Sequence, residues 1–354
     1  STNLFSPAGF LDAGQGATLP PPPNTVLPTG SLMVETRLSP DEGPQTLLGF
    51  HRPRPHPSHI SLQAMPTGGV VLVISNGDDV CHVSLDHQPD ERTEVLRITY
   101  SWDMPRNWGR LSVELPETGK CFTTVLKKPK PLALNDVRDI TMHPSRRNMH
   151  NDVVFMAVST KVESVGPMPA LASTVPIRTP GGFRKAWDFR RGDVVSTQAS
   201  GVVPVLHTIR RTVPAFGSFS PIRLRAPYFG LLQDIVVAPQ QRLMIRGSRV
   251  EYMFGVENVL VPACHLVNGR AAIQETRHQL VSYCHLLLPN HESIDAAGTE
   301  IESLNIGRIR RRGSFLDASL LAPFDRTTLP DHSQALAPVL RPYDAIALAE
   351  ARAA

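Results

Sequence analysis

The strongest constraint on the fold is a series of short stretches, filling the first half of the chain, in which apolar and polar residues alternate. The alternation begins at residues 32–37 and recurs with a spacing of about ten residues, the spacing typical of antiparallel strands. Turn residues such as Asn76-Gly77-Asp78 separate the stretches. The alternating runs are residues 45–50, 60–64, 70–75, 80–85, 95–102, 110–115, 121–126 and 153–159. They predict an antiparallel β-sandwich over 31–165, with no helix in that range.

Composition supports a chain of two β domains. The 354 residues are enough for two domains of roughly 150 residues each. The 33 prolines and 24 glycines favour short strands and turns over long helices. We expect an all-β protein: a Pro-rich lead over 1–30, the sandwich over 31–165, a second domain over 170–312 and a tail over 313–354.

Charge and hydropathy narrow the possible partners. Lys and Arg number 36 against 32 Asp and Glu, a net charge of +4, which gives no reason to expect nucleic acid. No apolar run approaches the length of a transmembrane helix, so no membrane span is expected. The N-terminal Ser-Thr-Asn-Leu-Phe does not resemble a secretory signal, which leaves a cytoplasmic location or export without a signal peptide.

The cysteines and histidines suggest no metal or other cofactor. None of Cys81, Cys121, Cys264 and Cys284 lies in a Cys-x-x-Cys motif, so we expect four buried, reduced thiols. The histidine- and proline-rich residues 51–59 predict an extended loop without a chelating geometry.

Proline and glycine also mark the parts outside the strands. Pro20-Pro21-Pro22-Pro23 is stiff polyproline and predicts a linker or an arm on a surface. Val165-Gly166-Pro167-Met168-Pro169 predicts a short joint between the domains. The alanine-rich residues 343–354 predict one short C-terminal helix.

Within the first domain, one stretch resembles a known type of sandwich. Leu96-Arg97-Ile98-Thr99-Tyr100-Ser101-Trp102-Asp103, followed by Trp108-Gly109-Arg110-Leu111, is similar to the middle strands of laminin-G or concanavalin-like domains. That resemblance implies possible glycan or calcium binding. Asp78, Asp79 and Asp103 are scattered and form no calcium-binding motif.

The second domain resembles the Hint (Hedgehog/intein) family, in its bacterial branch. The run 170–182, which contains Thr179-Pro180-Gly181-Gly182, is similar to the family's opening, and Gly192-Asp193-Val194-Val195 matches its Gly-Asp-x-Val strand. Residues 234–245 are similar to the block that carries Ser-Pro-x-His-Arg. Further similarities occur in register at 205–211, 259–263, 283–287, 291–292, 302–304 and 339–345.

The resemblance implies self-cleavage chemistry that this chain lacks. An active Hint domain needs a nucleophile at its first residue and a Ser/Thr-x-x-His pair that acts on the scissile amide. The nucleophile position is Ala170, the Ser/Thr position is Ala238 and the His position is Gln241. A methyl group cannot attack a carbonyl, and glutamine is neither acid nor base near neutral pH. We therefore predict no catalytic residues and no enzyme.

Other candidates do not restore the chemistry. Ser173 lies three residues beyond the nucleophile position, and Cys264 is interpreted as a packed strand residue. Cys284 and His285 are adjacent on a predicted strand, so their side chains should point to opposite faces. An engineered Cys-to-Ala change would explain Ala170 but leaves Ala238 and Gln241 unexplained.

These features together predict a structural or interaction protein built on a degenerate Hint domain and a lectin-like sandwich. We expect protein partners or a homo-oligomer within a larger assembly. Two alternatives stay open: an autoproteolytic precursor trapped by loss of its nucleophile, and a glycan-binding module.

Overall fold

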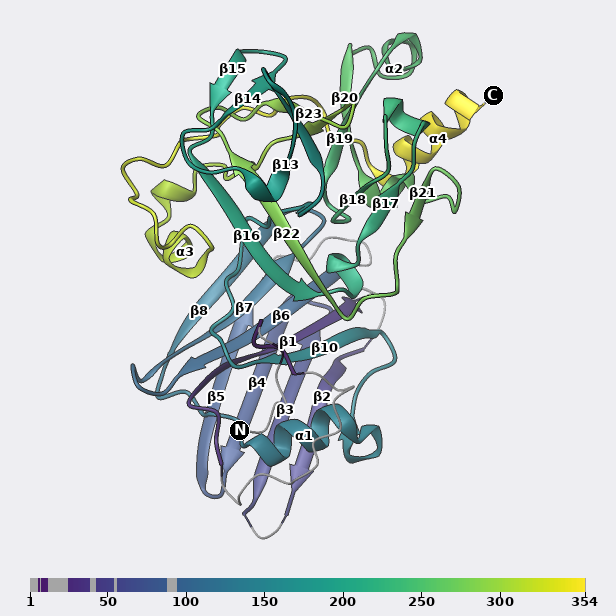
Figure 1. The fold of residues 1–354 in the computed structure, drawn as a ribbon. Helices are drawn as coiled ribbons and strands as arrows, with labels where there is room; N and C mark the ends of the chain where they lie inside the picture. The colour runs from purple at the N-terminus through teal and green to yellow at the C-terminus, as the bar shows by residue number, and fades with distance from the viewer. Residues whose placement is uncertain are drawn as a thin grey trace. The chain divides into compact units, whose positions relative to one another are not determined.

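The computed structural model shows an all-β chain that divides into two compact units, residues 1–166 and 167–354 (Figure 1). It describes residues 6, 8–11, 25–38, 43–53, 56–87 and 94–353, with side chains described as far as Ala349. The polyproline run at 20–23 lies outside the described residues, as do Arg54 and Pro55 of the predicted histidine-rich loop. The predicted all-β class is confirmed.

The first unit is a sandwich of two antiparallel sheets. The first sheet has the order β10-β1-β6-β7-β8 and the second the order β5-β4-β3-β2-β9. The strands of the first sheet are β1 (Thr29–Leu38), β6 (Glu94–Asp103), β7 (Trp108–Leu115), β8 (Lys120–Lys127) and β10 (Val153–Ser159). Those of the second are β2 (Gln45–Arg52), β3 (Ser58–Met65), β4 (Gly69–Asn76), β5 (Asp79–Asp86) and β9 (Arg147–Asn148).

Alternation produces the core between these sheets, because successive strand residues point to opposite faces. In β4, Val70, Leu72 and Ile74 are buried while the residues between them are partly exposed. Each run predicted to form a strand in this unit does so. The prediction of no helix was wrong: α1 (Leu134–Met142) packs against the core through Leu134 and Val137, followed by the short helix η1 (Pro144–Arg146).

A close approach fixes the position of β1 against β6. A Cβ placed on Gly30 would lie 2.5 Å from Cζ2 of Trp102 and 2.8 Å from the carbonyl oxygen of Ser159. Both neighbours are held in strands and cannot retreat. We expect Gly30→Ala to destabilise this unit by about 1–3 kcal/mol, the usual cost of overpacking a core. Thermal unfolding checks this, with Gly43→Ala as the control, since nothing lies within 4 Å of a Cβ there.

The segment after β10 lies along the polar face of the first sheet. Ser31 Oγ accepts the Glu163 N–H and donates to the Lys161 carbonyl, each at 2.8 Å. A guanidinium N–H of Arg110 donates to the Glu163 carbonyl, and the Gly166 N–H donates to Glu114 Oε1 at 3.0 Å. The segment suggested by the sequence as a joint is therefore bound to the first unit as far as Gly166.

The second unit contains two further sheets. One has the order β16-β22-β11-β18-β17-β21; the other has the order β13-β12-β23-β24-β19-β20, with β14 pairing with β15 and β23. The strands of the first are β11 (Leu171–Ala172), β16 (His207–Pro214), β17 (Ile222–Leu224), β18 (Ile235–Val237), β21 (Ala272–Gln274) and β22 (Leu280–Leu287). Those of the second are β12 (Pro176–Thr179), β13 (Gly182–Lys185), β14 (Val194–Thr197), β15 (Gly201–Pro204), β19 (Arg242–Arg246), β20 (Asn258–Pro262), β23 (Ser293–Ala296) and β24 (Thr299–Glu302).

Short helices and the C-terminal segment complete this unit. The predicted C-terminal helix is found as α4 (Pro342–Ala353), which lies beside α2 (Ser248–Phe254) in Figure 1. Leu340 and Leu348 enter the main core, and Leu316 of α3 enters a second apolar cluster with Leu287. The remaining helices are α3 (Gly313–Ala318), η2 (Ala186–Asp188), η3 (Gly217–Phe219), η4 (Tyr228–Gly230), η5 (Ala263–Leu266) and η6 (Ile309–Arg311). No helix in the described part of the chain is both long and apolar enough to cross a membrane.

Candidate functional site

The fold brings together the positions that the sequence singled out as degenerate. Ala170 immediately precedes β11, whose Leu171 pairs with Val237 of β18 and with Cys284 of β22. This pairing places the turn after β18 against the start of β11. The Ala238 N–H donates a hydrogen bond of 2.7 Å to the Ala170 carbonyl. The two alanines, 7% and 4% exposed, are thus buried neighbours, and neither side chain carries a functional group.

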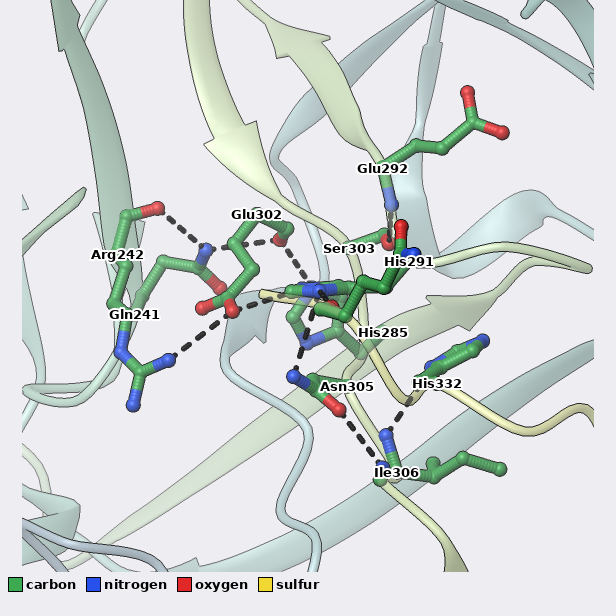
Figure 2. A network of polar contacts seen from close by, with 12 residues as sticks. Gln241, Arg242, His285, His291, Glu292, Glu302, Ser303, Asn305, Ile306 and His332 are labelled. Carbon is green, nitrogen blue, oxygen red and sulfur yellow. Dashed lines mark hydrogen bonds and ion pairs between the residues drawn. The ribbon is translucent and has the colours of Figure 1, made fainter. Parts of the chain in front are cut away.

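Gln241 ends the turn between β18 and β19, and its side chain is used in hydrogen bonds to the backbone. It is 2% exposed. Its Nε2 donates to the carbonyl oxygens of Arg242 and Glu302, each at 3.1 Å, while Oε1 is buried without a hydrogen-bond partner (Figure 2). Its backbone joins the turn to the start of η5, because the Ala263 N–H donates to the Gln241 carbonyl at 2.8 Å. The side-chain amide of Gln241 therefore ties β19, through the Arg242 carbonyl, to β24, through the Glu302 carbonyl.

Glu302, at the end of β24, is the centre of the polar network that surrounds Gln241. Its Oε1 lies 2.8 Å from Nε2 of His291 and 3.2 Å from a guanidinium nitrogen of Arg242. Burial alone would raise the pKa of Glu302, but the hydrogen bond with His291 and the nearby charge of Arg242 hold this pKa below its usual value. Glu302 is therefore an ionised, buried carboxylate whose partners lie on other elements.

His285, on β22, binds the same backbone carbonyl as Gln241. Its Nε2 lies 3.0 Å from the Glu302 carbonyl oxygen, and Nδ1 is buried without a hydrogen-bond partner. Because Nε2 faces a carbonyl oxygen, it carries a proton and donates to that oxygen. Burial lowers the pKa of His285 to about 4, against weaker opposing effects of its hydrogen bond and of Glu302. His285 is thus a neutral structural donor at physiological pH.

His291 and His332 form a stacked pair at the edge of this network, with ring centroids 5.8 Å apart (Figure 2). The Ile306 N–H donates to Nδ1 of His332 at 3.3 Å, so Nε2 carries the proton and donates to the Leu288 carbonyl at 3.1 Å. Burial lowers the pKa of His332. This histidine therefore holds the tail segment against the chain that follows β22.

The other candidate nucleophiles occupy structural positions. Cys264 lies in η5, where its N–H donates to the Pro239 carbonyl, so its assignment to a strand was wrong. Cys284 is on the predicted strand, and burial raises its thiol pKa to about 12, which leaves it unreactive near neutral pH. Ser173 lies between β11 and β12, and its carbonyl accepts the Trp187 N–H.

The cysteines and acidic residues give no sign of a metal centre. The four cysteines are free thiols; only Cys284 is fully buried, whereas the sequence predicted burial for all four. Across the part of the chain that the structure describes, no three His, Cys, Asp or Glu side chains are grouped as a metal site would require. The prediction of a loop over the whole of 51–59 was wrong at both ends, because His51 lies in β2 and His59 in β3, with their ring centroids 6.0 Å apart.

Comparison with known proteins identifies the class of the second unit. Residues 169–308 match the family model described as the Hint domain, so the C-terminal part of the chain contains a Hint domain. The match places Ala170 one residue inside the domain start. A β-sandwich precedes this domain, and its assignment to the laminin-G type stays a prediction.

Solved structures resemble parts of the chain only distantly. The Ruminococcus gnavus IT-sialidase CBM40 bound to alpha2,3 sialyllactose is 15% identical, with 44% of this chain and 86% of that chain covered and a TM-score of 0.29. The MchDnaB-1 intein is 14% identical, with 38% of this chain and 99% of that chain covered and a TM-score of 0.26. No curated protein matches the sequence.

Proposed function

We propose that this chain is a non-catalytic structural or interaction protein, in which a Hint domain persists without self-cleavage. One observation supports the proposal: the positions at which the resemblance expects the self-cleaving groups hold Ala170, Ala238 and Gln241, and Ala170 and Ala238 are hydrogen-bonded neighbours. A nucleophile must present a thiol or hydroxyl to the preceding carbonyl, and none is present at position 170. The amide of Gln241 is committed to two backbone carbonyls.

The competing possibility is a self-cleaving precursor that lacks only its nucleophile. In that case the remaining acid–base groups should still be in place, and restoring a thiol at position 170 should restore cleavage. General acid–base catalysis typically contributes about 10²–10⁴-fold in rate. Ala238 and Gln241 cannot supply that contribution, which favours loss of the whole centre over loss of the nucleophile alone.

We expect the native chain and Ala170→Cys to remain intact when each is incubated overnight with dithiothreitol. Cleavage before residue 170 would give fragments of 169 and 185 residues, which a denaturing gel and intact-mass spectrometry resolve. Ala170→Ser, which places a weaker nucleophile at the same position, is compared with Ala170→Cys and should also remain intact. Two fragments of these sizes from the native chain or from Ala170→Cys would overturn the proposal.

The interaction role has a separate test in the mass of the particle in solution. Light scattering after gel filtration is expected to give a mass above the 38.8 kDa of one chain, either alone or with a copurified partner. A single chain that stays monomeric at high concentration and carries nothing with it would count against this part of the proposal.

A further inference from the structure

A short segment at the edge of the Hint domain combines cations with aromatic rings. Residues 183–191 read Phe-Arg-Lys-Ala-Trp-Asp-Phe-Arg-Arg, with four basic residues against one acidic residue. They form β13 and η2 and the start of the following loop. Nothing in the proposed function uses this segment, and it contains none of the degenerate positions.

Two of its aromatic side chains are exposed and fixed by guanidinium groups. Phe183 is 41% exposed and Trp187 is 36% exposed. The Arg178 guanidinium carbon lies 4.4 Å from the centroid of Phe183, and that of Arg210 lies 5.0 Å from the ring of Trp187. Arg210 also donates to the Trp187 carbonyl at 2.7 Å. The rings are held in place before any partner arrives, which reduces the entropy cost of binding.

The surface around these rings carries excess positive charge. Arg178 pairs with Asp295, and Arg184 pairs with Asp193 at 3.0 Å. Three further cations have exposed side chains: Lys185, Arg190 and Arg191. With Arg210 included, six cations face three carboxylates, the third being Asp188. The complementary partner is therefore acidic.

The strand in this segment, β13, lies at the edge of its sheet. β13 is the terminal strand in the order β13-β12-β23-β24-β19-β20, and its only described partner is β12. Arg178 and Phe183 are opposite each other in that hairpin, so they share a face, and the alternation of strand side chains puts Lys185 on the same face. An edge strand offers unpaired N–H and C=O groups that an extended peptide can pair with.

We propose that the β13 edge binds an extended acidic peptide, which adds as a further strand with its carboxylates toward Lys185 and Arg178 and its apolar side chains on Phe183 and Trp187. The backbone edge favours a peptide over a nucleic acid or an acidic glycan. Those polymers would satisfy the cations but cannot pair with β13 along its length. The proposal adds a partner class to the interaction role; an intact chain that bound no such peptide would leave the non-catalytic proposal standing.

The first test is fluorescence anisotropy of the full chain with a labelled, capped peptide of repeating Glu-Thr-Val-Thr, whose Glu and Val side chains share one face of an extended strand. We expect saturable binding that weakens as salt is raised. The same peptide with every backbone amide N-methylated keeps its charge but has no backbone N–H to donate to β13, and should bind at least about tenfold more weakly. Equal binding of the two peptides, or no binding of the first, would overturn the proposal.

Matched variants locate the site. Lys185→Glu and Trp187→Ala should each weaken binding about tenfold or more, a difference measurable in the same assay. Arg249→Glu and Tyr252→Ala make comparable changes, a charge reversal and the loss of an aromatic ring, at exposed positions on α2 and should leave binding unchanged. Melting curves verify folding, and Lys185→Ala replaces any variant that fails. If oligo(dT) or heparin displaces the peptide and binds more tightly with the same sensitivity to Lys185→Glu, the surface is a polyanion site and the peptide proposal is wrong.

Discussion

Replacing Trp102 with alanine should lower the free energy of unfolding of the first unit by about 3–5 kcal/mol, the range for removing a buried aromatic residue. Trp102 is fully buried on β6, the middle strand of its sheet. Its indole stacks on Tyr100, with centroids 5.4 Å apart, and its Nε1–H donates to the Leu27 carbonyl at 2.8 Å. The substitution removes the packing, leaves a cavity and deprives a backbone carbonyl of its donor.

Differential scanning calorimetry of the full chain measures this effect, because two units are expected to give separable transitions. Trp187→Ala is the control, since the same residue type is removed at a position that is 36% exposed. We expect a small change for Trp187→Ala and a large one for Trp102→Ala. Similar changes for the two variants would show that Trp102 does not hold the sandwich core together.

The strands of the sandwich could be predicted because their signals are local. Each alternating run lies within one strand, and turn residues such as Gly77, with φ of +64°, sit between strands. Sequence reasoning missed α1, although Leu134, Val137 and Ile140 recur every three residues and are buried. A nine-residue helix spans fewer than three turns, too few for its period to stand out among strands.

The centre of the Hint domain was predictable in part. The resemblance placed Ala170 and the turn at 238–241 in one functional centre, and the hydrogen bond between Ala238 and Ala170 shows that they are neighbours. The network around Glu302 was not predictable in the same way. Its members come from loops and from three strands: β19 and β24, which pair in one sheet, and β22, which lies in the other. No sequence spacing links Arg242 to His291.

Lowering the pH from 6.5 toward 4 should destabilise the second unit through His285. Burial lowers the pKa of its imidazole to about 4 in the folded chain, whereas the unfolded chain has the ordinary value of 6.5. Over this range the unfolded state binds a proton that the folded state does not, so stability is present above pH 6.5 and is lost as the pH falls. The difference of about 2.5 in pKa corresponds to about 3 kcal/mol.

Two neighbouring groups act in the same direction. Burial also lowers the pKa of His332. The pKa of Glu302 is held below the usual 4.5 by the partners of this carboxylate, so the stability that Glu302 contributes is lost only at still lower pH. Denaturant unfolding at several pH values between 7 and 4 measures the total slope. His285→Gln keeps a donor for the Glu302 carbonyl but removes the titration, and should flatten this slope. An unchanged slope in that variant would assign the acid sensitivity to other groups, because glutamine at position 285 binds no proton in this range.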